Sequence, residues 1–162
     1  MLEALSETEY ATWVRESLWG WPMSLTVHAF GNAAVIGLSF IIALRLLGFF
    51  RTIPYASLSR LFPVIWIAFV FQAFSGASLW MTKPDKYIKA GMFDFKFTFV
   101  IVGGVLTWYL QDTIKREAAV WQSSGTVSPR GTNLAIATAI VWAAVLMTGR
   151  LTAYLGQLYG VG

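Results

Sequence analysis

The only histidine of the chain, His28, lies in a run without charged side chains, residues 23–44. Asn32 and Ser39 follow it by four and eleven residues, so on an α-helix the three side chains share one face. Polar groups in lipid are costly unless they face a partner such as another helix or a bound group. His28 and Asn32 are therefore candidate cofactor-binding residues. The simpler alternative is a histidine that hydrogen-bonds to a neighbouring helix.

Two cations lie in otherwise apolar stretches, Lys96 and Arg150. If the chain forms four antiparallel spans, both come to the depth of His28, which lies ~8–9 Å below Pro22 at 1.5 Å per helical residue. Cations at that depth can bind the acidic groups of a cofactor. Both residues are therefore candidate cofactor-binding residues. Lys96 is also near enough to the expected membrane surface to extend its ammonium group into the headgroups.

Four methionines fall at the same expected depth: Met23, Met81, Met92 and Met147. Thioether and imidazole ligands favour Cu(I). Met147 together with His28 is the candidate metal-ligand set. Methionine is more commonly a gap filler in a core. The chain has no Met-x-x-Met or histidine-rich run, which weighs against copper.

The composition is that of a membrane protein. Of 162 residues, 57% are hydrophobic and 12% are charged, whereas a soluble domain carries about 25% charged residues. The absence of cysteine excludes disulfides, thiolate metal sites and iron–sulfur clusters. The net charge of +4 lies in short loops, so it indicates membrane orientation and not nucleic-acid binding. No nucleophile–base pair, phosphate loop or carboxylate dyad suggests hydrolysis or phosphoryl transfer.

Four apolar segments predict four membrane-spanning helices, since ~20 apolar residues are needed to cross ~30 Å of hydrocarbon. We expect an all-α, integral membrane four-helix bundle over residues 22–162. The third span has too short a charge-free part, residues 97–111, so it must begin near Met92. A polar linker over 122–132 should separate it from the last span, which is expected to begin at Asn133. In that span, Ala135, Ala139 and Ala143 have the four-residue spacing that lets membrane helices approach closely.

Residues 1–21 predict an amphipathic helix at the membrane interface. Its charged residues lie opposite an apolar face that is rich in aromatic side chains. This face consists of Tyr10, Trp13, Val14, Leu18 and Trp21. A helix that packs on the bundle as a cap is the alternative.

The basic residues predict the orientation. Arg45, Arg51 and Arg60 follow the first span and only Arg15 precedes it, so the first loop should be cytoplasmic. Over all loops lysine and arginine divide evenly, and the orientation therefore depends on the first helix. We expect both termini outside the cytoplasm, in a bacterial inner membrane.

Short motifs resemble a known group. His28-Ala29-Phe30-Gly31 and Leu44-Arg45-Leu46-Leu47-Gly48 are similar to the first helix of small CopD-like four-helix membrane proteins. Residues 71–79 and Phe93-Asp94-Phe95-Lys96 resemble the second and third helices of that group. The resemblance covers roughly residues 22–112. Ala43 stands where the closer relatives carry an acidic residue.

A more distant similarity reaches the HemJ-type protoporphyrinogen oxidases, which share the four-helix plan and bind b-type haem. In that family a first-helix histidine and a third-helix lysine are essential. The resemblance places these roles on His28 and Lys96.

Three functions follow as expectations. The first is a b-type haem protein that carries out electron transfer or redox chemistry near the outer face, between a quinone and a periplasmic redox protein. The second is a non-catalytic subunit of a larger membrane complex or homo-oligomer, and the third is a copper-handling protein. Whether the chain is an enzyme stays open.

Overall fold

The computed structural model describes residues 2–84 and 92–158, and this part of the chain is helical without strands. Two short helices precede the bundle, and a 3₁₀ helix, η1, leads into its second long helix. In chain order the elements are α1 (Leu2–Ser6), α2 (Glu9–Glu16), α3 (Gly20–Leu46), η1 (Tyr55–Leu61), α4 (Phe62–Thr82), α6 (Met92–Ser124) and α7 (Pro129–Leu158).

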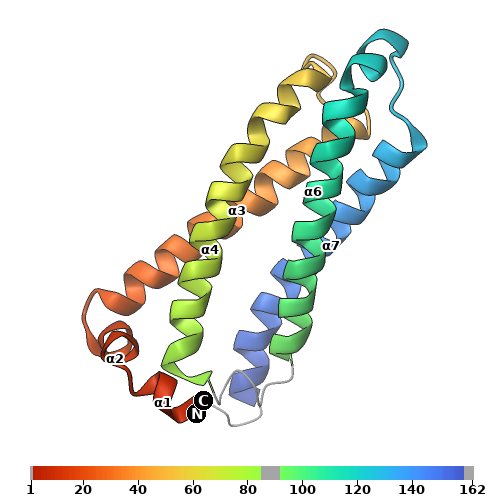
Figure 1. Ribbon diagram of the computed structural model, residues 1–162. Helices are drawn as coiled ribbons and strands as arrows, with labels where there is room; N and C mark the ends of the chain where they lie inside the picture. The colour runs from red at the N-terminus through yellow and green to blue at the C-terminus, as the bar shows by residue number, and fades with distance from the viewer. Residues whose placement is uncertain (1, 85–91, 159–162) are drawn as a thin grey trace.

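Four helices are long and apolar enough to cross a membrane: α3, α4 with η1, α6 and α7. The 27 residues of α3 extend ~40 Å, more than the ~30 Å of hydrocarbon in a bilayer. The predicted all-α membrane bundle is thus confirmed. The helices alternate in direction, so α1 and the end of α7 lie at the same end of the molecule (Figure 1).

The connection between α6 and α7 is shorter than expected. α6 continues to Ser124, and α7 begins at Pro129 instead of Asn133. Gly125, at φ +72°, ends α6 in the left-handed conformation that glycine adopts most easily. Proline is well suited to the first position of a helix, and Ser128 Oγ accepts a hydrogen bond from Gly131 N at 3.2 Å. Of the residues predicted as a linker, 122–124 therefore extend α6 and 129–132 form the first turn of α7.

The loop between α3 and η1 is held by Arg45, which is only 4% exposed. Its Nε donates to Ile53 O at 2.6 Å, and its guanidinium lies 3.8 Å from the centre of the Tyr55 ring. Backbone carbonyls and an aromatic face thus satisfy this buried cation. Its role in the fold is to close the connection from α3 to α4.

The long helices pack as two hairpins, α3 with α4 and α6 with α7, which meet where α3 contacts α7 and where η1 contacts α6 (Figure 1). The largest fully buried side chains gather in the half of the bundle that η1 closes. They include Ile42, Phe62, Ile65, Leu110, Ile114, Trp121 and Trp142. The opposite half, toward the termini, contains the cavities described below.

The N-terminal segment forms two helices where one was predicted. Thr8 caps α2, since its Oγ1 accepts from Ala11 N at 3.3 Å, and the chain bends there. Ala11 and Val14 are fully buried, and the Tyr10 hydroxyl is hydrogen-bonded to Ser78 Oγ of α4 at 2.8 Å. α2 therefore packs on the bundle. Trp13 is nevertheless exposed, so an aromatic surface remains for the membrane interface.

Candidate functional site

A cavity of about 580 Å³ lies between α3 and α7, and we call it the α3–α7 cavity. All four predicted cofactor-binding residues line it: His28, Asn32, Lys96 and Arg150. The rest of its wall is formed by small and aliphatic residues. No described residue that lines it is acidic.

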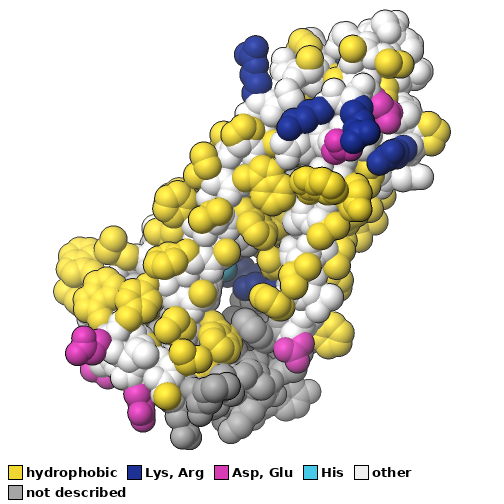
Figure 2. All heavy atoms as spheres, viewed as in Figure 1, with side chains coloured by type: hydrophobic (Ala, Val, Ile, Leu, Met, Phe, Trp, Pro, Cys, Tyr) yellow, Lys and Arg dark blue, Asp and Glu magenta, His cyan; other side chains and the backbone are white. Residues whose placement is uncertain are grey.

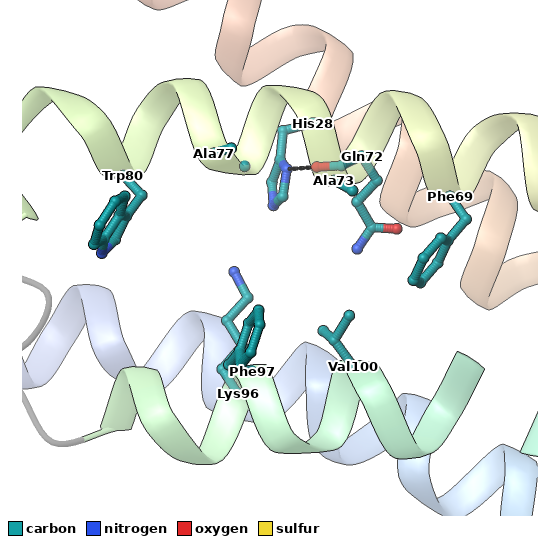
Figure 3. A pocket seen from close by; sticks show the side chains of 10 residues that line it. His28, Phe69, Gln72, Ala73, Ala77, Trp80, Lys96, Phe97 and Val100 are labelled. Carbon is teal, nitrogen blue, oxygen red and sulfur yellow. Dashed lines mark hydrogen bonds between the residues drawn. The ribbon is translucent and has the colours of Figure 1, made fainter. Parts of the chain in front are cut away.

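His28 is held by the backbone of α4. Its Nδ1 lies 3.1 Å from Gln72 O and 3.2 Å from Ser75 Oγ. Because a carbonyl oxygen only accepts, the neutral ring carries its proton on Nδ1 and leaves Nε2 as an acceptor or ligand. In Figure 3 the ring extends from α3 toward α6, with Nε2 on the side of Lys96. Metal-bound histidines usually donate their second ring nitrogen in this way.

Gly76 makes room for the imidazole. A methyl group at this position would lie 3.1 Å from His28 Cε1 and 3.4 Å from Nδ1. Glycine therefore allows α4 to approach the ring closely enough for the hydrogen bond from Nδ1 to Gln72 O.

Gln72 belongs to the site although the sequence analysis did not select it. Its side chain is 4% exposed, and its Nε2 donates to Asn32 Oδ1 at 2.6 Å. Its Oε1 is buried without a hydrogen-bond partner among the described residues. The available signal was that Gln72 is the only amide side chain in α4.

Lys96 points into the bundle, toward His28, and not outward to a headgroup (Figure 3). On its α7 side a methyl group at Gly149 would lie 3.7 Å from Lys96 Nζ, so the ammonium group passes close to that glycine. Arg150 follows on α7 and is exposed at the edge of the α3–α7 cavity. The ion pairs found in the described residues involve neither of these cations.

The predicted metal pair is not brought together. Met147 is 63% exposed and lines neither the α3–α7 cavity nor the second cavity described below. Leu146, Gly149 and Arg150 of the same helix do line the α3–α7 cavity. Met23 is also exposed. Within residues 2–84 and 92–158, no three His, Cys, Asp or Glu residues form a metal-binding group. Helix rotation explains the difference, because residues at one depth can still face opposite sides.

A second cavity, of about 400 Å³, lies between α4 and α6 and shares His28 and Lys96 with the first. We call it the α4–α6 cavity. Figure 2 shows a hollow between these helices, with hydrophobic side chains on both sides and a histidine and a basic side chain inside. Its wall is mostly aromatic and aliphatic. The remaining lining residues are Phe69, Gln72, Ala73, Gly76, Ala77, Trp80, Phe97 and Val100.

Comparison with known proteins identifies no relative, since no family model, no curated protein and no solved structure matches the chain.

Proposed function

We propose that this chain is a membrane b-type haem protein that takes part in electron transfer or redox chemistry, with haem in the α3–α7 cavity and His28 as an iron ligand. The observation that carries the proposal is the orientation of His28. Its Nδ1 is held by Gln72 O at 3.1 Å, so Nε2 is available on the side of the bundle interior. Bound haem supplies one-electron chemistry whose potential depends on the axial ligands and on the surrounding polarity.

The residues present fit such a group. A volume of about 580 Å³ lies within the range of ~300–1,000 Å³ that is usual for cofactor sites. Haem carries two carboxylates, and the cavity offers Lys96 and Arg150 without an acidic competitor among its described lining residues. The aliphatic walls, including Leu25 and Ile36, suit a flat apolar ring. Asn32, fixed by its bond from Gln72, supplies a polar group at the same wall.

The kinship with CopD-like and HemJ-type proteins is part of this proposal. His28 and Lys96, the positions to which the resemblance assigns essential roles, both line the α3–α7 cavity. The cavity lies in the half of the bundle toward the termini, which the orientation predicted from Arg45, Arg51 and Arg60 places at the outer face. A quinone in the bilayer and a periplasmic redox protein are the partners that this position favours.

The test is an absorption spectrum of the detergent-purified protein. We expect a Soret band and b-type bands on reduction, both lost in His28→Ala. Phe30→Ala is the matched control, because Phe30 lies on the same helix but is largely exposed to lipid. Lys96→Met separates two roles, since loss of an iron ligand changes the spin state, whereas loss of a propionate partner mainly weakens haem retention. Arg150→Gln should weaken retention with the ligand set unchanged.

Two results would replace the proposal. A colourless protein with about one copper atom per chain would support copper handling. A protein with neither haem nor copper that co-purifies with a larger complex would support the accessory subunit.

A further inference from the structure

The α4–α6 cavity opens sideways on the apolar surface of the bundle. Phe97, one of its lining residues, is 59% exposed, and Ala73 and Ala77 of α4 are exposed as well. Hydrophobic side chains lie on both sides of the opening (Figure 2). Because α4 and α6 are long and apolar enough to cross a membrane, the molecules that reach this opening are those dissolved in the bilayer.

Polar groups lie at the back of this apolar cavity. Gln72 lines it, and the Oε1 of this side chain is buried without a partner among the described residues, which is costly unless a donor meets it. Lys96 points into the same space and offers only hydrogen-bond donors (Figure 3). A suitable ligand therefore both donates to an amide oxygen and accepts from an ammonium group.

The walls restrict the shape of that ligand. Phe69, Trp80 and Phe97 line the cavity along its length, and aromatic rings pack well on flat rings (Figure 3). No described lining residue is acidic, so nothing favours a cationic head. A phospholipid acyl chain would contact the walls but would leave Gln72 Oε1 without a donor.

We propose that the α4–α6 cavity binds the ring of a membrane-dissolved quinol, which enters sideways between α4 and α6. A 1,4-quinol is flat, carries a hydroxyl at each end of its ring, and has an apolar tail that stays in the lipid. One hydroxyl donates to Gln72 Oε1 after a small shift of the amide, because this oxygen is almost inaccessible without one. The oxygen of the other hydroxyl accepts from Lys96 Nζ. Any connection of this ligand to haem rests on the function proposed above, whereas its binding does not.

The first test needs no mutation. The purified protein in phosphatidylcholine nanodiscs is titrated, without oxygen, with decylubiquinol or with its dimethyl ether, which cannot donate a hydrogen bond. A ligand that binds the folded state raises the midpoint of thermal unfolding. We expect the quinol to bind about tenfold more tightly than the ether, as a buried hydrogen bond implies. In Gln72→Leu this preference should disappear. Equal binding of quinol and ether to the natural protein would overturn the proposal in favour of an unspecific apolar filler such as an acyl chain.

A reciprocal pair of variants separates the two cavities. Ala77 lines only the α4–α6 cavity and Ala33 only the α3–α7 cavity. Ala77→Leu should weaken quinol binding at least tenfold and leave haem content unchanged, and Ala33→Leu should do the reverse. Quinol binding that survives Ala77→Leu would place the ligand elsewhere and overturn the inference.

The two proposals fail separately. A protein with haem whose unfolding midpoint the quinol does not raise would overturn this inference alone. A colourless protein that the quinol stabilises, with the ether and Ala77→Leu behaving as stated, would overturn the haem proposal and leave the quinol site standing.

Discussion

At the scale of single residues, the site depends on how α4 holds His28. The Gln72 carbonyl orients the ring by accepting the hydrogen bond from Nδ1. Gly76 leaves room for the ring, since a methyl group at this position would lie 3.1 Å from Cε1. An imidazole with a fixed tautomer presents one defined nitrogen to a ligand. The same helix thus supplies both the acceptor and the gap.

The histidine tautomer is directly measurable, because the chain has a single histidine. In haem-free protein with ¹⁵N-labelled histidine, we expect the neutral ring to carry its proton on Nδ1. Gly76→Ala should shift both ring nitrogen signals, since a Cβ 3.1 Å from Cε1 forces the ring to move. Gly104→Ala is the control, because its Cβ would meet Phe69 only at 3.7 Å. A proton found on Nε2 would contradict the geometry derived for His28.

At the scale of elements, the crossing of α3 and α4 is set by another glycine. A methyl group at Gly31 would lie 2.8 Å from Gln72 Cβ, 3.1 Å from Gln72 Cα and 3.2 Å from Ala68 O. Two of these atoms belong to the backbone of α4, so a side chain at position 31 can be accommodated only if the helices separate. The crossing also holds Gln72 next to Asn32.

Gly31 and Gly37 of α3 therefore predict opposite outcomes. Gly31→Ala should destabilise the bundle by about 2 kcal/mol, as is typical of overpacking. Gly37→Ala should be neutral or slightly stabilising, because no atom lies within 4 Å of its Cβ and alanine favours helix. Denaturant-induced unfolding in detergent micelles measures both. Equal stability of the two variants would show that α3 and α4 do not cross at Gly31.

The alanine stripe of α7 gives a second comparison at this scale. Ala135 is fully buried and Ala139 packs against the core, while Ile140 is 63% exposed. Ala139→Leu should lower the unfolding free energy by about 1–3 kcal/mol, because added methylenes must displace packed neighbours. Ile140→Leu should be nearly silent. Equal tolerance of both substitutions in the same unfolding assay would mean that this stripe faces lipid.

At the scale of the whole molecule, charge is distributed unevenly between the two ends. Figure 2 shows a group of basic side chains at the end that η1 closes and several acidic side chains at the opposite end. The basic end carries Arg51, Arg60, Lys115, Arg116 and Arg130. Over all loops lysine and arginine nevertheless divide evenly, so the orientation still depends on the basic residues that flank the first span.

Cysteine labelling in intact cells tests this orientation, since the chain contains no cysteine. Cysteines at the exposed positions Thr52 and Ser124 should resist an impermeant thiol reagent. One at the exposed Glu7 should react. Labelling after cell lysis is the control and should modify all three. The reverse labelling pattern would show that the bundle has the opposite orientation in the membrane, with the proposed haem site at the cytoplasmic face.

The number of spans was readable from the sequence because the requirement for apolar residues in hydrocarbon is local. Each span is a run of residues whose length can be counted, and the structure has a long helix over each run. The end of α6 was misjudged for a local reason as well. Polar residues after the apolar run suggested a linker, but α6 continues through them until Gly125 ends it, and α7 begins at Pro129.

The sequence by itself also identified the candidate site residues, since polar side chains are rare enough in these spans to stand out. Common depth was a sufficient guide for His28, Lys96 and Arg150, and a shared helix face for Asn32, since all four line one cavity. It was insufficient for Met147, because depth along a helix says nothing about rotation around it. Only the tertiary structure decided that Gln72 faces His28 and that α4 and α6 leave a cavity between them. Both depend on how closely the backbones of different helices approach, and that distance is set by glycines and side chains far apart in the chain.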